Sequence, residues 1–197
     1  MRSSKLYPFL ALLIEFGPLI LFLILSWYSD FILAVEALVI STILSLFLSL
    51  IVRGRVAIFP LIAGLTIVLM GAITIYTNDS SFIIARDTIF NGCLSLIIFQ
   101  GLRKNKLILK NLFENTFGIS DKGWRIISIN WATWLAILAL SNQFVGSFYP
   151  LSYWITFKTF SFGFSILFCI YQFFIAHKEK LNNSNILGLR KNALIKN

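Results

Sequence analysis

Charged residues are scarce in this chain of 197 residues: Asp, Glu, Lys and Arg together make up 13% of it, while 58% is hydrophobic and 16% is aromatic. The mean hydropathy is +0.84. Soluble globular proteins contain about 25% charged residues, so this composition excludes an ordinary soluble domain. A disordered chain is excluded as well, because such chains are rich in polar residues and poor in aromatic ones.

The residues that usually bind metals or act as nucleophiles are also few. The single histidine is His177, and the two cysteines, Cys93 and Cys169, are far from any Cys-x-x-Cys spacing. A zinc site needs three or four such ligands, and isolated cysteines in apolar segments ordinarily pack as small hydrophobic residues. No Walker loop, Gly-x-Ser-x-Gly or His-Glu-x-x-His motif is present in the sequence. We therefore predict no enzyme activity, no catalytic residue, no metal site and no cofactor.

Long apolar runs are what the chain has in abundance. A transmembrane helix needs about 20 predominantly apolar residues, because the hydrocarbon core is about 30 Å thick, and these runs lack the alternation of a membrane β-barrel. We predict an all-α polytopic membrane protein with six transmembrane helices. The segments are Leu6–Tyr28, Phe31–Val52, Val56–Tyr76, Phe82–Leu102, Ile126–Phe148 and Leu151–Ala176. Gly64 and Gly71 place small residues on one face of the third segment, which favours close helix packing.

The links between these segments are too short to fold alone, so the function lies in the membrane or at its surface. We predict one helical membrane domain over residues 1–176 and a basic, flexible cytoplasmic tail over 177–197. An alternative has five spans, with the segment Leu6–Tyr28 re-entrant or interfacial. That alternative would move the N-terminus to the other side of the membrane.

Lysine and arginine lie on one side of the predicted membrane. If all six segments span, 15 of the 17 Lys and Arg residues fall on one side, and the links 29–30, 77–81 and 149–150 on the other side contain none. Cytoplasmic loops are enriched in Lys and Arg, so we predict that both termini are cytoplasmic. The net charge of +9 is then explained by the basic cytoplasmic loops of a membrane protein. Nucleic-acid binding is not predicted, because the chain has no compact basic domain.

The longest link, residues 103–125, contains a predicted short amphipathic helix. Its apolar residues recur at helical spacing beside basic ones, which is typical of a helix in the membrane interface near anionic head groups. We expect this helix to end near Gly118 and the next helix to be capped by Ser120 or Asp121. The link would either anchor the bundle or bind a partner. The apolar residues are Ile108, Leu109, Leu112, Phe113 and Phe117.

Five ionisable residues lie inside the predicted spans, where each costs about 2.5–3.5 kcal/mol to insert. This candidate intramembrane polar cluster comprises Glu15, Glu36, Arg86, Asp87 and Lys158. At about 1.5 Å per residue, Glu36, Arg86 and Lys158 lie about 6–11 Å from the outer face. At this depth Glu36 or Asp87 could pair with Lys158, and Asp87 could pair with Arg86. Such pairs would either hold helices together or line a polar cavity for a lipid head group or an ion.

Short motifs along the chain follow the order and spacing of a known family. They are found in the stretches Glu15–Leu19, Pro60–Asp79, Phe82–Asn91, Asp121–Arg125, Trp131–Asn142 and Trp154–Phe160. Together they resemble the motifs of the bacterial intracellular septation protein A (YciB) family. The chain departs from the family pattern at Arg86, Asp87, Asn130 and Gln143, which stand in place of Lys, Pro, Arg and Glu.

The resemblance implies an inner-membrane protein of Gram-negative bacteria that supports cell division (septation), envelope biogenesis and integrity, and membrane homeostasis, without an established catalytic activity. Its implied partners are membrane lipids and other membrane proteins of division and envelope synthesis. The family is usually described with five spans, whereas the charge distribution favours six. The alternative function is that of a small transporter or lipid-handling protein, although the two halves of the chain share no motif of the kind that transporter repeats show.

Overall fold

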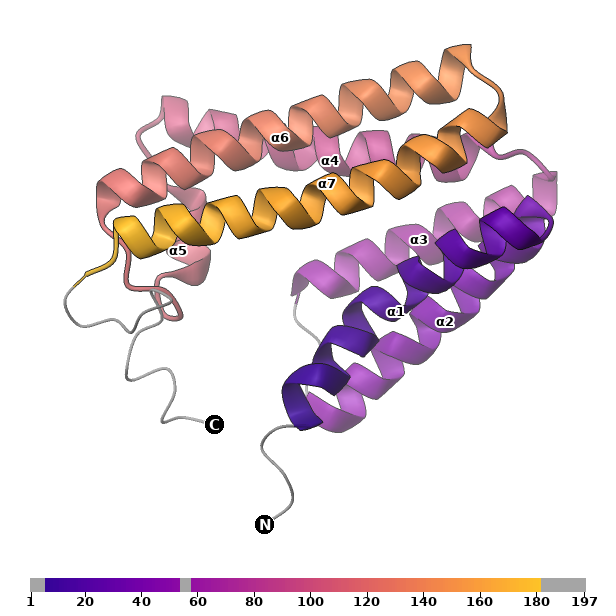
Figure 1. Cartoon of the computed structure of the whole chain (residues 1–197), viewed down its shortest axis with the longest axis horizontal. Coiled ribbons are helices and arrows are strands. Elements are labelled where there is room, and N and C mark those ends of the chain that lie inside the picture. Colours follow the sequence, from indigo (N-terminus) through magenta and orange to yellow (C-terminus); the bar gives the residue numbers. More distant parts are fainter. Residues whose placement is uncertain (1–5, 54–57, 182–197) are drawn as a thin grey trace. The chain divides into compact units, whose positions relative to one another are not determined.

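The structure, a computed structural model, describes the backbone of residues 6–53 and 58–181 and the side chains of these residues apart from 6–14, 52, 53 and 59. Its regular elements are helices (Figure 1). They are α1 (Leu6–Tyr28), α2 (Phe31–Arg53), α3 (Ile58–Thr77), α4 (Ser81–Arg103), α5 (Ile108–Phe113), α6 (Asp121–Phe148) and α7 (Leu151–Lys178). Over the described ranges, strand pairing is limited to one β-bridge between Ile119 and Lys180. The predicted all-α fold is confirmed.

Each predicted apolar segment overlaps a helix, and polar residues extend several helices beyond the apolar run. The predicted start of the third segment, Val56, lies outside the described residues. The largest extension is at α6, which begins at Asp121 rather than at Ile126. Ser120 caps this helix, because its hydroxyl oxygen accepts a hydrogen bond from the N–H of Gly123 at 3.1 Å. Hydropathy marks the part of a helix that lipid covers, and it misses the polar turns that continue the helix into water.

Five helices contain described stretches that are long and apolar enough to cross a membrane, namely α2, α3, α4, α6 and α7. Helix α1 has 23 residues, and the part of it with described side chains, Glu15–Tyr28, forms a shorter apolar helix. A polytopic membrane protein is therefore shown. The sixth span, and the cytoplasmic N-terminus that depends on it, stays a prediction.

The chain divides into two compact units, and the division passes through α4, α6 and α7. Unit 1 contains the residues up to Asp87 together with Asn142–Thr159, and unit 2 contains Thr88–Ser141 together with the residues from Phe160 onwards. The predicted membrane domain over 1–176 and tail over 177–197 stay predictions. Residues 182–197 of that tail lie outside the described residues.

In unit 1, α1 packs against α2, and α2 packs against α3 (Figure 1). Helices α2 and α3 approach each other closely at Gly64 and Gly71, the two glycines for which close packing was predicted. A Cβ atom at Gly64 would lie 2.9 Å from Leu46 Cδ1, and one at Gly71 would collide with Val39 Cγ2. Packing of this kind matters in lipid, where no hydrophobic effect drives helices together. The prediction that Gly64 and Gly71 permit close helix contact is confirmed.

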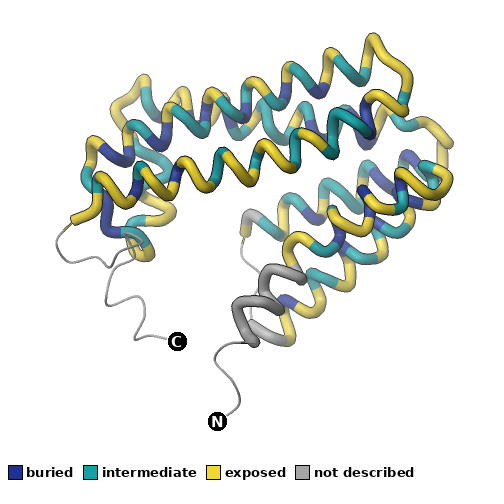
Figure 2. The backbone as a smooth tube through the Cα atoms, viewed as in Figure 1, coloured by how far each residue is buried: buried dark blue, intermediate teal, exposed yellow. Residues whose placement is uncertain are grey.

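Exposed positions run along the helices beside buried ones (Figure 2). Many carry large apolar side chains that are more than half exposed, among them Ile40, Phe47, Leu140 and Phe164. Soluble proteins rarely present so much contiguous apolar surface to water. These faces are suited to contact with lipid acyl chains.

Unit 2 contains a compact cap where α6 begins and α7 ends. Trp124, which is 3% exposed, packs in one buried cluster with Ile119, Ile127 and Ala176. The Ser120 N–H donates a hydrogen bond of 2.9 Å to the carbonyl that follows α7, at residue 179. The backbone after α7 is therefore fixed to the segment before α6 as far as residue 181.

The predicted amphipathic helix is present as α5, but it is shorter than expected. It ends at Phe113, because the chain turns there and the N–H groups of Thr116 and Phe117 both donate to the Phe113 carbonyl at 2.9 Å. Gly118 is buried, and its carbonyl accepts a hydrogen bond from the Leu181 N–H at 2.9 Å. The prediction that Gly118 ends the helix is therefore wrong, since this glycine instead contacts the segment after α7.

Candidate functional site

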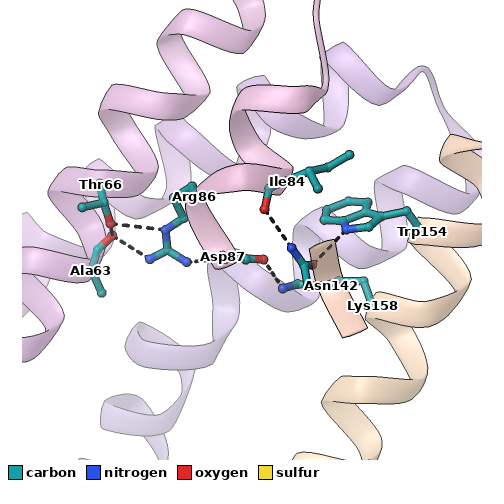
Figure 3. Close-up of polar contacts among 8 residues, drawn as sticks. All are labelled: Ala63, Thr66, Ile84, Arg86, Asp87, Asn142, Trp154 and Lys158. Atoms are coloured by element: carbon teal, nitrogen blue, oxygen red, sulfur yellow. Dashed lines mark hydrogen bonds and ion pairs between the residues drawn. The ribbon is translucent and has the colours of Figure 1, made fainter. Parts of the chain in front are cut away.

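Asp87 binds two cations through its carboxylate (Figure 3). Arg86 Nη1 lies 2.6 Å from Asp87 Oδ1, and Lys158 Nζ forms an ion pair with Oδ2. Arg86 and Asp87 are in α4, whereas Lys158 is in α7, so the carboxylate joins the two helices. We call these three residues the Asp87 triad. Their side chains are largely buried, with 12% exposure for Arg86 and Asp87 and 21% for Lys158.

Arg86 extends the triad to α3. Its Nε donates a hydrogen bond to Thr66 Oγ1 at 3.2 Å, and its Nη2 donates to the Ala63 carbonyl at 3.0 Å (Figure 3). With Nη1 on Asp87, all three nitrogens of the guanidinium group therefore have protein partners. A planar guanidinium with several directed donors is well suited to linking two helices in this way.

Asn142 links α4, α6 and α7 beside the triad. Its Nδ2 donates to the Ile84 carbonyl at 2.8 Å, and its Oδ1 accepts a hydrogen bond from Trp154 Nε1 at 2.9 Å (Figure 3). Asn142 is 2% exposed and Trp154 is 1% exposed. Buried polar groups are stable when they are hydrogen-bonded, so this asparagine fixes its neighbours strongly.

Trp154 also connects the site to α1 and α2. Its ring meets those of Phe22 and Phe31 edge to face, with centroids 6.3 and 6.0 Å apart. Lys158 Nζ also lies 5.8 Å from the centroid of the Trp154 ring, within the range of a cation–π contact. The site therefore involves every long helix of unit 1.

The turn between α3 and α4 positions the start of α4, from which Arg86 and Asp87 project. The fully buried Thr74 accepts a hydrogen bond from the Ile83 N–H at 3.1 Å. Asp79 Oδ1 accepts one from the Ser81 N–H at 2.9 Å. This N–H, together with the Ser81 hydroxyl, lowers the pKa of Asp79 below its usual value, because both groups stabilise the carboxylate.

The five residues of the predicted intramembrane polar cluster do not all come together. Arg86, Asp87 and Lys158 are in direct contact, and the carboxylate that pairs with Lys158 is Asp87. Glu15 is exposed on α1. Glu36 is exposed on α2, on the same face as Leu33 and Ile40, and no described contact joins it to Lys158. The similar predicted depths of Glu36 and Asp87 were therefore not enough to predict which of them pairs with Lys158.

Thr66 and the Ala63 carbonyl were not predicted from the sequence as partners of Arg86. A signal did exist, because a threonine inside an apolar span is a hydrogen-bonding group at membrane depth. Sequence gives no means of assigning such a threonine to one arginine among several candidates. The role of Trp154 as a donor to Asn142 was likewise not predictable without knowing how α6 and α7 pack.

The described side chains show no arrangement for metal binding. Within residues 6–53 and 58–181, no three His, Cys, Asp or Glu residues gather as metal ligands would. The triad itself contains two cations and one carboxylate, which gives it a formal charge of about +1 at neutral pH. Such an arrangement can hold helices together and can attract an anion.

Comparisons with a family model and with individual proteins point to the same family. Residues 10–183 match the model of the family described as intracellular septation protein A. The inner membrane-spanning protein YciB of a Bradyrhizobium species is 26% identical over 160 residues, which cover 81% of this chain and 80% of that protein. YciB of Brucella melitensis biotype 1 is 26% identical over 192 residues, covering 89% and 96% of the two chains. No solved structure matches this chain.

These relatives are named as inner membrane-spanning proteins, and the chain has several helices that suit a membrane span. It is therefore a multi-pass protein of the inner membrane. The family model covers most of its length, from residue 10 to residue 183. This protein belongs to the intracellular septation protein A family.

Proposed function

We propose that this protein is a non-enzymatic inner-membrane component that supports septation and envelope integrity through contacts with lipids and other membrane proteins. The observation that carries the proposal is the Asp87 triad, whose charges bind one another and groups on neighbouring helices. Such a network favours one arrangement of helices. Catalysis would instead require a nucleophile, acid or base that is free to reach a substrate.

The family name supports the link with septation. The surface that would meet partners is the cap of unit 2. Basic residues are exposed there near the end of α4, the start of α6 and the end of α7. They are Arg103, Lys104, Lys106, Lys122, Arg125, Lys178 and Lys180. We place this cap in the cytoplasm, because basic residues are enriched there. It would contact anionic lipid head groups and acidic segments of division and envelope-synthesis proteins.

Gene deletion in the source bacterium tests the cellular role. We expect longer cells with fewer septa, together with increased permeability to a dye that an intact envelope excludes, and we expect the wild-type gene to reverse both effects. Cell length, septum frequency and dye uptake are measured on the same cultures. A deletion strain with normal division and a normal permeability barrier would contradict the proposal.

Two substitutions of Lys158 test the non-enzymatic part. Lys158→Arg keeps a cation that can pair with Asp87, but arginine cannot act as a proton donor or acceptor at neutral pH. We therefore expect Lys158→Arg to complement the deletion and Lys158→Met to complement it poorly. Immunoblots of membrane fractions control for protein level. Loss of function in Lys158→Arg at a normal protein level would contradict a non-enzymatic role.

A further inference from the structure

The Asp87 triad contains more positive charge than its own carboxylate can neutralise. Arg86 and Lys158 are both cationic, and both pair with the single carboxylate of Asp87. These side chains are largely buried in helices that suit a membrane span. An unbalanced charge in a medium of low dielectric constant is costly unless a counter-ion approaches it.

The surplus charge lies on Lys158 rather than on Arg86. All three guanidinium nitrogens of Arg86 donate to protein groups. An ammonium group has three N–H donors. Among the described residues, Lys158 Nζ has one hydrogen-bond acceptor, Asp87 Oδ2, and lies over the ring of Trp154. Two donors are therefore available on the most exposed side chain of the triad.

The position of Lys158 suits contact with a lipid head group. It is seven residues beyond the start of α7 at Leu151, or about 11 Å along the helix, and a lysine side chain near a helix end can direct its ammonium group towards the head groups. The indole Nε1 of the exposed Trp27 donates to Thr159 Oγ1 at 3.1 Å, next to Lys158 in the sequence. Tryptophan is enriched at head-group level.

We propose that Lys158 binds the phosphate group of an anionic phospholipid, and that Asp87 weakens this binding by neutralising part of the charge. Phosphate oxygens accept hydrogen bonds from ammonium groups, and a net negative head group complements the surplus positive charge. The lipid is favoured over free phosphate because the partly exposed Lys158 side chain lies in a helix that suits a membrane span, where lipid rather than water surrounds the helix. The proposal holds whether or not the protein supports septation.

Substitutions of Lys158 and Asp87 test the proposal because they act in opposite directions. Full-length protein in detergent is titrated with phosphatidylglycerol, and binding is followed by native mass spectrometry, with phosphatidylcholine as the reference lipid. Removing one cation near a lipid surface weakens binding about fivefold, so we expect Lys158→Gln to bind phosphatidylglycerol about that much more weakly. We expect Asp87→Asn to bind it more tightly by a similar factor.

The opposite signs separate a lipid site from a structural ion pair. Both substitutions break the same ion pair, so a purely structural role would shift lipid binding in the same direction in both variants. That result would overturn the proposal, as would unchanged binding in Lys158→Gln. The matched control is Gln143→Leu, which changes an exposed neutral side chain outside the triad and outside the basic cap and should leave phosphatidylglycerol binding unaltered.

Two further measurements keep the test decisive if Asp87→Asn does not fold. Lys158→Arg, which keeps the charge, should bind phosphatidylglycerol like the wild-type protein, and binding as weak as in Lys158→Gln would contradict the proposal. In a competition arm, millimolar inorganic phosphate is added to the wild-type protein with bound phosphatidylglycerol. We expect the lipid to remain bound, and its displacement would overturn the assignment to a lipid. Circular dichroism of each variant confirms that the helices are intact.

Discussion

Asp87 and Lys158 are 71 residues apart in the sequence, and they form an ion pair between α4 and α7. The same carboxylate also binds Arg86, its neighbour in the chain. The acidic and basic residues of this network are not equivalent. Asp87 pairs with two cations, whereas Arg86 and Lys158 both pair with the same carboxylate. Removing the acid and removing a base should therefore have unequal effects on stability.

We expect Asp87→Asn to lower the free energy of unfolding by about 3 kcal/mol, since it leaves two buried cations side by side. Lys158→Met should cost less, about 1 kcal/mol, because Arg86 continues to neutralise Asp87 and methionine fills a similar volume. The unfolding midpoints of both variants in lipid nanodiscs measure the difference. Equal losses, or a larger loss in Lys158→Met, would contradict the assignment of Asp87 as the shared partner.

Asn142 offers a second test of the buried network. Asn142→Leu removes the acceptor of Trp154 Nε1 and the donor to Ile84. We expect a loss of about 2–3 kcal/mol, because a buried N–H is left without a partner. Gln143→Leu, at the neighbouring exposed position, is the control and should change stability by less than about 0.5 kcal/mol. Similar unfolding midpoints for the two variants would show that the Asn142 contacts contribute little.

The contact between α2 and α3 predicts the effect of adding one methyl group. Gly71→Ala places a Cβ against Val39, and we expect a loss of about 1–3 kcal/mol from overpacking. Gly163→Ala, where a Cβ would meet nothing within 4 Å, should instead be neutral or stabilising by up to about 1 kcal/mol. Combining Gly71→Ala with Val39→Ala should restore most of the lost stability in thermal unfolding. Failure of that rescue would argue against a steric cause.

Glu36 carries a charge on an otherwise apolar exposed face. Because no described residue pairs with it, we expect Glu36→Leu to raise the unfolding midpoint of the purified protein in nanodiscs, with a gain of up to about 2–3 kcal/mol. Leu33→Ile, on the same face, controls for changes in packing. A lower midpoint in Glu36→Leu would mean that this carboxylate makes a stabilising contact after all.

Cysteine labelling tests the predicted orientation. In a background in which Cys93 and Cys169 are replaced by alanine, Asp30→Cys should react with a membrane-impermeant thiol reagent added from the periplasm. Lys104→Cys should react only after the inner membrane is permeabilised, because basic loops are retained in the cytoplasm. A cysteine placed at Ser3 distinguishes six spans from five. Labelling of that position from the periplasm would support five spans and remove the predicted cytoplasmic N-terminus.

Local sequence was sufficient to locate the helices but not all of their ends. The apolar runs located the long helices and five stretches that suit a membrane span, while the start of α6 and the end of α5 depend on polar contacts that hydropathy does not record. Ser120 extends α6 by capping it, and the chain turns after Phe113 to bring Gly118 against Leu181. The second of these contacts joins segments that are distant in the chain, so its effect on Gly118 could not be predicted.

The long apolar runs alone establish a helical membrane protein, because segments of this length with so few charges are stable as helices in lipid. The ionisable residues at membrane depth can also be read from the sequence, and an unpaired charge there is costly. Which of these residues meet became clear from the packing of the helices. Asp87 binds Lys158 and Glu36 does not, because that choice depends on which faces of α2, α4 and α7 are turned toward one another, and helix rotation is set by packing rather than by depth.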